Sequence, residues 1–282
     1  MHALPLAIAL LTAAALAPAT LRLLRDGGHV RVNYRGHALP CPEGVLVLAA
    51  AAVALAPVLL VQRLASTSLL YAEALPAALY AFGVIGLGLL DDALGEGRIA
   101  PDGAPVRGVR RHLAAIGRGE LSTGAVKGAG SLGLALLAAG PLERGDGRWL
   151  LAAAVLVLAT HVFNLLDLRP GRAVKALALV GAAVTAGAQE LRPLFSLGLF
   201  AGPALVAGVY DLRERALLGD TGASLCGALA GLWLVLGTGA ATQLAALAVL
   251  ISIALYAEIR SLSELIERTP GLRELDSWGR PS

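Results

Sequence analysis

Long apolar runs separated by short polar connections constrain this chain more than any other feature of its sequence. Runs of about 17–25 apolar residues can cross the hydrocarbon core of a bilayer as helices. A helix satisfies its backbone hydrogen bonds internally, as hydrocarbon requires. The sequence therefore predicts an all-α fold, a polytopic transmembrane helical bundle. We expect about nine spans, at residues 3–20, 45–62, 70–90, 125–142, 148–166, 174–188, 193–210, 222–236 and 240–257.

The amino-acid composition argues against other classes of protein. Charged residues make up 15% of the chain, whereas a soluble domain carries about 25%. Aromatic residues make up 4%, too few for the aromatic girdles of a porin-like barrel. The net charge of +3 comes from basic residues scattered among the connections, so we expect no nucleic-acid partner. The two cysteines, Cys41 and Cys226, show no spacing typical of a disulfide or metal framework.

The distribution of basic residues predicts the orientation of the spans. Arg22 and Arg25 follow the first apolar run rather than precede it, which favours an uncleaved first span with the N-terminus outside. The connections that then face the cytoplasm, together with the adjoining span ends, hold 19 of the 23 Lys and Arg residues. These connections are 21–44, 91–124 (with a short amphipathic stretch around 110–116), 167–173, 211–221 and 258–282. We expect one integral membrane domain over 1–282 with 258–282 as a cytoplasmic tail.

Two adjacent carboxylates, Asp91 and Asp92, follow the third predicted span. Adjacent negative charges repel each other and raise the affinity of at least one of them for a proton or a cation. Ionisable groups at membrane depth are candidates for a functional site. The alternative is that both carboxylates simply mark the membrane boundary and face water.

A second polar segment ends the fifth predicted span. Asn164 and Asp167 are three residues apart and so share a helix face. Basic residues continue at the same spacing: Arg169, Arg172 and Lys175. We expect Pro170 to interrupt the helix. Carboxamide, carboxylate and cations together suit a ligand with hydroxyls and phosphates, whereas an ordinary basic loop would explain only the Arg and Lys residues.

A third segment, Gly219-Asp220-Thr221-Gly222, precedes the eighth predicted span. A helix that begins here directs N–H groups and the positive end of its dipole toward the cytoplasm, which favours an anion. Asp220 could bind the cation that accompanies a phosphate, or it could simply cap the helix.

Carboxylates from all three segments would meet at the cytoplasmic ends of the spans. Mg²⁺ prefers oxygen ligands and typically takes one or two carboxylates with water and substrate phosphates. Asp91, Asp92, Asp167 and Asp220 could supply those oxygens, whereas no set of His and Cys residues indicates zinc.

In this order and spacing, the three segments resemble the acidic motifs of the polyprenyl-phosphate N-acetylhexosamine-1-phosphate transferase superfamily, which includes phospho-N-acetylmuramoyl-pentapeptide transferase. The loop from Asn33 to Gly44 is similar to that family's first cytoplasmic loop. Ser122-Thr123-Gly124 with Lys127 is similar to a further loop element. The resemblance extends from about residue 30 to at least residue 225.

The resemblance implies transfer of a sugar-1-phosphate from a UDP-sugar to a polyprenyl phosphate, with release of UMP and a need for Mg²⁺ or, alternatively, Mn²⁺. It implies Asp91, Asp92 and Asp220 as catalytic residues, with Asp220 and Asp92 as metal ligands. The substrate-binding residues that it implies are Asn164, Asp167, Lys127, Arg169, Arg172, Thr221 and Gly222. It also implies a multi-pass homodimer in the inner (cytoplasmic) membrane, in contact with membrane lipid, whose active face is cytoplasmic.

Two departures from the family pattern keep a second interpretation open. The segment Leu168-Arg169-Pro170-Gly171 lacks a further Asp that the cell-wall enzyme carries there. Residues 267–276 stand where the family has a His-rich loop. The alternative is a non-catalytic paralogue that binds a lipid-linked sugar or a partner membrane enzyme. A transporter would carry paired Gly- or Pro-broken spans in matching halves, a pattern that is not evident in the sequence.

Overall fold

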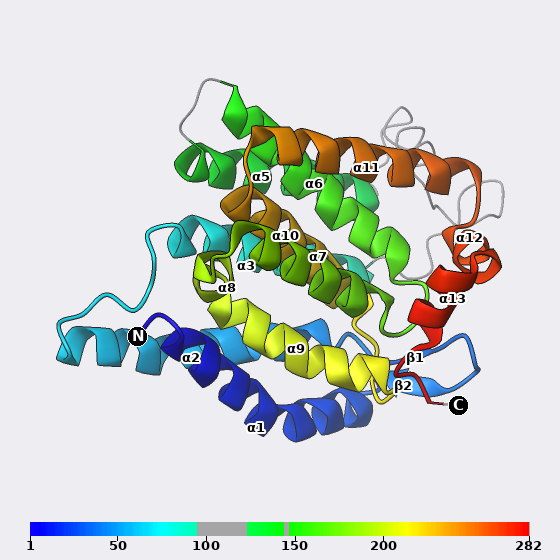
Figure 1. Ribbon diagram of the computed structural model, residues 1–282. Coiled ribbons are helices and arrows are strands. Elements are labelled where there is room, and N and C mark those ends of the chain that lie inside the picture. Colours follow the sequence, from blue (N-terminus) through cyan, green and yellow to red (C-terminus); the bar gives the residue numbers. More distant parts are fainter. Residues whose placement is uncertain (95–122, 144–146, 282) are drawn as a thin grey trace.

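The computed structural model describes residues 1–94, 123–143 and 147–281, and within them all elements except one β-hairpin are helices (Figure 1). The expected amphipathic stretch around 110–116 and Ser122 lie outside the described residues. The elements in chain order are α1 (Leu4–Asp26), β1 (Val30–Val32), β2 (Ala38–Pro40), α2 (Gly44–Leu64), α3 (Ala74–Leu94), α5 (Thr123–Leu142), α6 (Arg148–Leu166), α7 (Arg172–Ala188), α8 (Arg192–Ser196), α9 (Gly198–Leu212), α10 (Gly219–Gly237), α11 (Ala240–Ile259), α12 (Leu262–Arg268) and α13 (Pro270–Ser277).

Among the described helices, 7 are long and apolar enough to cross a membrane, namely α1, α2, α3, α5, α6, α10 and α11. The predicted all-α membrane bundle is confirmed at this level. Two of the expected spans correspond to shorter helices, α7 with 17 residues and α9 with 15.

The expectation of one continuous span over 193–210 is wrong, because the chain bends between α8 and α9. Pro193 lies in the first turn of α8, where its missing N–H costs nothing and its fixed φ favours a helix start. The backbone of Leu197 (φ −93°, ψ 1°) then departs from helical values, so a new helix begins at Gly198.

Helix α10 lies at the centre of the bundle. Over an apolar stretch of 18 residues, 83% of the residues of α10 are buried, whereas 11% are buried over a stretch of the same length in α11. Small residues allow the neighbouring helices α2, α3, α6 and α7 to approach its backbone closely. The outer helices expose large aliphatic side chains, which a bilayer would cover.

The basic connections meet at one end of the bundle, which we call the hairpin end because β1 and β2 lie there (Figure 1). Side-chain contacts join connections that are far apart in the sequence. These contacts are Arg31–Asp92, Asn33–Glu214, Arg35–Pro281 and Arg169–Glu267. Five connections were expected on one side of the membrane. Their described parts lie together at the hairpin end.

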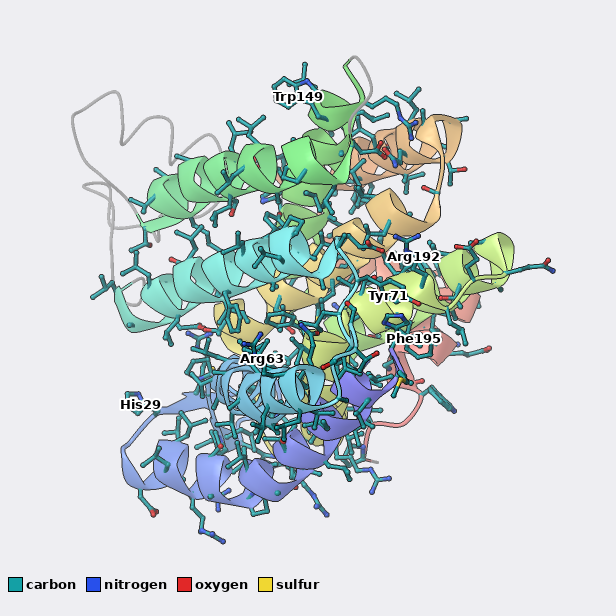
Figure 2. All side chains as sticks on the ribbon, turned by 90° about the vertical axis from the view of Figure 1, so that its left-hand side faces the viewer. His29, Arg63, Tyr71, Trp149, Arg192 and Phe195 are labelled. Carbon is teal, nitrogen blue, oxygen red and sulfur yellow. The ribbon has the colours of Figure 1, made fainter. Side chains whose placement is uncertain are left out.

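The opposite end of the bundle carries a separate polar contact. Figure 2, which faces this end, shows Arg192, Tyr71 and Phe195 near one another. Arg192 Nε lies 2.6 Å from Glu73 Oε1, and its guanidinium lies 5.1 Å from the centre of the Tyr71 ring. Ser196 donates a further hydrogen bond to Glu73 at 3.1 Å. These contacts tie α8 to the connection before α3.

Candidate functional site

The adjacent carboxylates at the end of α3 face different neighbours. Successive residues point about 100° apart around a helix axis. Asp91 therefore contacts Lys127 of α5, whereas Asp92 contacts Thr221 of α10. The pair that forms one motif in the sequence divides between two environments in the structure.

The ammonium group of Lys127 lies among three oxygen-bearing side chains. Its Nζ is 3.3 Å from Asp91 Oδ2 and 3.6 Å from Asp220 Oδ1, and it donates to Asn164 Oδ1 at 3.2 Å. The carboxyl groups of Asp91 and Asp220 also interact directly. We call these four residues the Lys127 cluster. It joins the ends of α3, α5, α6 and α10 and brings together four of the predicted site residues.

A hydroxyl of α10 orients the amide of Asn164. The Asn164 amide nitrogen donates to Thr160 O at 2.8 Å and to Ser224 Oγ at 2.9 Å, so that its oxygen is directed toward Lys127. The sequence interpretation missed Ser224, which is fully buried. Its position four residues after Asp220, one turn along α10, is a signal that could have identified it.

Asp92 caps the N-terminus of α10. Its Oδ1 accepts a hydrogen bond from the Asp220 N–H at 3.0 Å. Its Oδ2 accepts from the Thr221 N–H at 2.8 Å and from the Thr221 hydroxyl at 2.6 Å. An anion was expected at this helix start, and within the structure that anion is the carboxylate of Asp92 itself. The Asp92 side chain is 2% exposed. Its observed contacts are those of a helix cap rather than those of the predicted metal ligand.

The close approach of α3 to the start of α10 depends on Gly219. Its φ of +68° lies in the left-handed region that favours glycine. An added Cβ would lie 2.6 Å from Pro42 Cβ and 2.9 Å from Asp92 Oδ2. Thr221 and Gly222, which were predicted to bind substrate, are buried in the same helix contacts. They position Asp220 rather than line an open surface.

A cavity of about 140 Å³ lies between the hairpin, the end of α6 and the start of α10. We call it the polar cavity, and its lining includes Arg31, Tyr34, Asp167, Arg169 and Gly219. Burial raises the pKa of Asp167 well above its usual range, and neighbouring carboxylates raise it further. Asp167 therefore favours a proton or a nearby cation. The structure thus places Asp167 beside the Lys127 cluster, in a separate cavity.

The basic residues after Asp167 contact the C-terminal segment. Arg169 pairs with Glu267, and its guanidinium lies 4.9 Å from the centre of the Tyr34 ring. Arg172, with a side chain that is 4% exposed, donates from Nε to Asp276 Oδ1 at 2.7 Å and from Nη2 to Oδ2 at 3.0 Å.

Lys175 also contacts this segment, because its ammonium donates to three carbonyls at the end of α13: Leu275, Asp276 and Trp278. Of the basic residues that follow Asp167, Arg169 lines the polar cavity. Arg172, expected to bind substrate, instead holds the tail against the bundle.

Two buried carboxyl groups near the site were not identified from the sequence. Asp211, at the end of α9, accepts hydrogen bonds from Gly171 N at 2.6 Å and from Leu218 N at 3.3 Å. Glu43 is fully buried, and within the described residues its carboxyl oxygens have no hydrogen-bond partner. Burial raises the pKa of Glu43 well above its usual range, and Asp211 raises it further. A single Asp or Glu beside an apolar run carries too little sequence signal to reveal such contacts.

The donors of the Lys127 cluster suit a hard divalent cation. Asp91 and Asp220 supply two carboxylates, and Mg²⁺ commonly takes one or two together with water and substrate phosphates. Within the part of the chain that the structure describes, no group of three or more His, Cys, Asp or Glu side chains is placed to hold a metal. The two carboxylates of Asp91 and Asp220 match the number that Mg²⁺ takes when water and a phosphate complete its coordination. The side chain of Asp220 is 40% exposed and that of Asp91 is 16% exposed, so the Asp220 carboxylate is the more accessible of the two.

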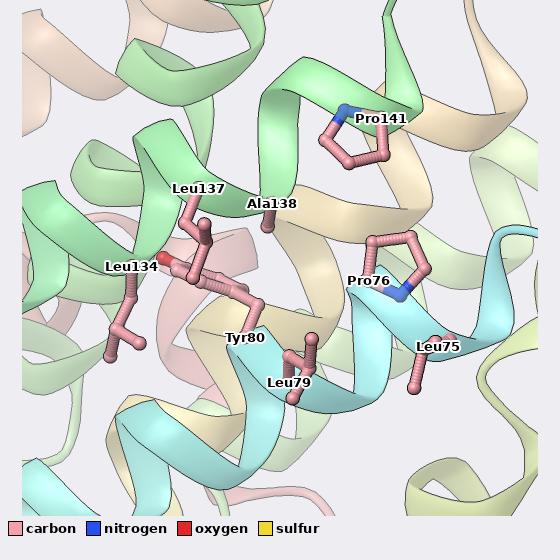
Figure 3. Close-up of a pocket in the computed structure, with 8 residues that line it drawn as sticks. All are labelled: Leu75, Pro76, Leu79, Tyr80, Leu134, Leu137, Ala138 and Pro141. Atoms are coloured by element: carbon pink, nitrogen blue, oxygen red, sulfur yellow. The ribbon is translucent and has the colours of Figure 1, made fainter.

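Two further cavities border the membrane-spanning helices. A cavity of about 250 Å³, which we call the α1–α3 cavity, lies between the end of α1, the hairpin and the end of α3. A second, almost wholly apolar groove of about 240 Å³ lies between α3 and α5, where Tyr80, Leu134 and Pro141 are among its lining residues (Figure 3). Tyr80 donates its hydroxyl to Leu156 O at 2.9 Å, so this groove presents little polar surface.

Comparison with protein-family models gives no match to this chain, and comparison with curated proteins gives none either.

Proposed function

We propose that the protein transfers a sugar-1-phosphate from a UDP-sugar to a polyprenyl phosphate and releases UMP. The observation that carries this proposal is the Lys127 cluster, where an ammonium group and two carboxylates meet at the ends of four helices. Phosphoryl transfer depends mainly on alignment and charge neutralisation, and these groups can supply both. We place the hairpin end in the cytoplasm of a multi-pass inner-membrane protein, because the basic connections gather there.

In the proposed reaction, a phosphate oxygen of the lipid attacks the sugar-bearing phosphorus of the UDP-sugar. One P–O bond forms, the bond to the bridging oxygen breaks, and UMP carries that oxygen away. Lys127 stabilises the negative charge on the phosphate groups, and Asn164, oriented by Ser224, holds Lys127 in place. Asp220 and Asp91 would hold Mg²⁺, which neutralises phosphate charge when bound.

The polar cavity is the proposed site of the soluble substrate. Tyr34 offers an aromatic face with the guanidinium of Arg169 above it. Arg31 and Asp167 add a cation and a carboxyl group to the same lining. Cations suit a diphosphate, and carboxyl groups suit hydroxyls of a ribose or hexose. The cavity holds only part of such a ligand, whose remainder would extend toward water.

Release of UMP tests the proposal. The purified protein is incubated with a panel of UDP-sugars, a polyprenyl phosphate and Mg²⁺. We expect at least one sugar to release UMP, chelation of Mg²⁺ to stop the release, and Asp220→Asn or Asp91→Asn to reduce it by about 100-fold or more. Glu264→Gln is the matched control, because Glu264 pairs with Arg268 at the exposed surface of α12. It should behave as the unchanged protein.

A non-catalytic binding protein is the second candidate, and one observation favours it. The Lys127 ammonium already pairs with both carboxylates, so one of their two negative charges is neutralised without a metal. In that case no UDP-sugar would release UMP, and Asp220→Asn would bind a lipid-linked sugar as the unchanged protein does. Those two results together would reject the transferase.

A further inference from the structure

The C-terminal segment, residues 262–281, lies beside the polar cavity at the hairpin end (Figure 1). Tyr34 and Arg169 line that cavity. Arg169 forms an ion pair with Glu267 in the last turn of α12. The guanidinium of Arg280 lies 5.9 Å from the centre of the Tyr34 ring. Two residues that line the cavity therefore also contact the segment.

Buried contacts anchor the segment on both sides of Glu267. Arg172 donates from Nη1 to Ser263 Oγ at 2.7 Å, before Glu267 in the chain. The same guanidinium pairs with Asp276, after Glu267, and the two side chains are 4% and 7% exposed. A buried, hydrogen-bonded ion pair resists separation, because each charge would be left without its partner. The backbone that carries Glu267 is therefore held in place independently of Arg169.

The ion pair between Arg169 and Glu267 is of a different kind, because water reaches both side chains. They are 29% and 45% exposed, and exposed ion pairs contribute little to stability. The Arg169 guanidinium also lies over the ring of Tyr34, which attracts a cation whether or not Glu267 is paired. Arg169 can therefore exchange its carboxylate partner for another anion while the segment stays docked.

A phosphate that enters the polar cavity would compete with Glu267 for the same guanidinium. Phosphate and carboxylate are both bidentate acceptors for arginine, and two anions close to one cation repel each other. We propose that Glu267 is an internal competitor of the soluble ligand: its carboxylate pairs with Arg169 and is displaced when a diphosphate binds there. Glu267 thereby lowers the affinity of the polar cavity for phosphates. This inference rests on the proposed function, which assigns a nucleoside diphosphate to that cavity.

Binding of UDP without turnover tests the proposal. The purified full-length protein is titrated with UDP and with uridine at physiological salt. We expect Glu267→Gln to bind UDP about fivefold more tightly than the unchanged protein, whereas uridine, which lacks phosphates, should bind both equally. Glu267→Asp keeps the charge and should bind UDP as the unchanged protein does. Glu264→Gln is the matched control, because it removes the same charge from α12 at the pair with Arg268, and it should change nothing.

A double-mutant cycle identifies Arg169 as the group for which Glu267 competes. Arg169→Gln should weaken UDP binding, and in that background Glu267→Gln should have no further effect. Saturating UDP should leave the C-terminal segment protected from limited proteolysis, because the pair of Arg172 and Asp276 stays intact. Thermal unfolding establishes that each variant is folded.

Four outcomes would overturn the inference. They are no binding of UDP, unchanged UDP affinity in Glu267→Gln, a tighter affinity that persists in the Arg169→Gln background, and release of the segment to protease by UDP. The third would indicate a general effect of charge, and the fourth would indicate movement of the whole segment.

The two proposals fail separately. Release of UMP from a UDP-sugar, with UDP affinity unchanged in Glu267→Gln, would reject the internal competitor and leave the transferase standing. Tighter UDP binding in Glu267→Gln, without release of UMP from any UDP-sugar, would retain the competitor and reject the transferase.

Discussion

Asp92 Oδ2 accepts two hydrogen bonds from a single residue, Thr221, whose N–H lies at 2.8 Å and whose hydroxyl lies at 2.6 Å. The two residues are 129 positions apart in the chain. Through this contact the end of α3 closes the N-terminus of α10, and Asp220 is held immediately beside it. Stability and the position of the candidate ligand therefore depend on the same carboxylate.

Removal of this cap should destabilise the protein. We expect Asp92→Ala to lower the free energy of unfolding by about 1–3 kcal/mol, because two N–H groups of α10 lose their acceptor. Thr221→Ser keeps the hydroxyl and should cost less than Thr221→Val. Thermal unfolding in detergent measures the difference. A variant Asp92→Ala as stable as Asp91→Ala would contradict the capping role.

Lys127 should compete with a divalent cation for the two carboxylates. Lys127→Met removes the positive charge between Asp91 and Asp220, so we expect Mg²⁺ to bind about tenfold more tightly while UMP release falls. Lys127→Arg keeps the charge and should bind Mg²⁺ as the unchanged protein does. Isothermal titration with Mg²⁺ measures these affinities. Identical affinities in all three proteins would show that the carboxylates do not form the cation site.

Docking of the C-terminal segment should depend on pH. Burial alone would raise the pKa of Asp276, but the hydrogen bonds and charges of Arg172 and Arg280 outweigh burial and lower the pKa below its usual value. A carboxyl group with a lowered pKa stabilises the fold above its unfolded pKa, about 3.9, and loses that contribution as the pH falls through the folded value.

We therefore expect limited proteolysis to release the segment increasingly as the pH falls below about 4. Asp276→Asn should release it already at neutral pH and show a flatter pH response. Glu264→Gln, at an exposed pair on α12, provides the control. A segment that stays protected in Asp276→Asn would contradict the assigned ion pairs.

Gly219 should tolerate no side chain. Gly219→Ala forces a Cβ into the left-handed region at φ +68° and to within 2.6 Å of Pro42 Cβ. We expect a loss of about 1–3 kcal/mol in the free energy of unfolding. Gly140→Ala is the matched control, because an added Cβ there meets nothing within 4 Å, and it should be neutral or slightly stabilising. Equal melting temperatures for the two variants would contradict this reading of the turn.

Local composition was sufficient to predict much of the fold. Apolar length identified the helices, and Pro170 lies between α6 and α7, as its missing N–H requires. The bend at Leu197 could not be predicted, because the sequence there remains apolar on both sides. The hairpin also escaped prediction, since its strands have only three residues each.

Apolar runs and charge placement were sufficient to predict a bundle of helices in which Asp91, Lys127, Asn164 and Asp220 lie toward one end. Spacing along the chain was enough for this, because helix length and charge placement are local properties. The partner of each charged side chain follows instead from how the helices pack. Asp91 joins Lys127, Asp92 caps α10, and Arg172 holds the tail through Asp276. The reason is physical: an ion pair or a cap forms between groups that packing brings within about 3 Å, and such distances depend on helices far apart in the sequence.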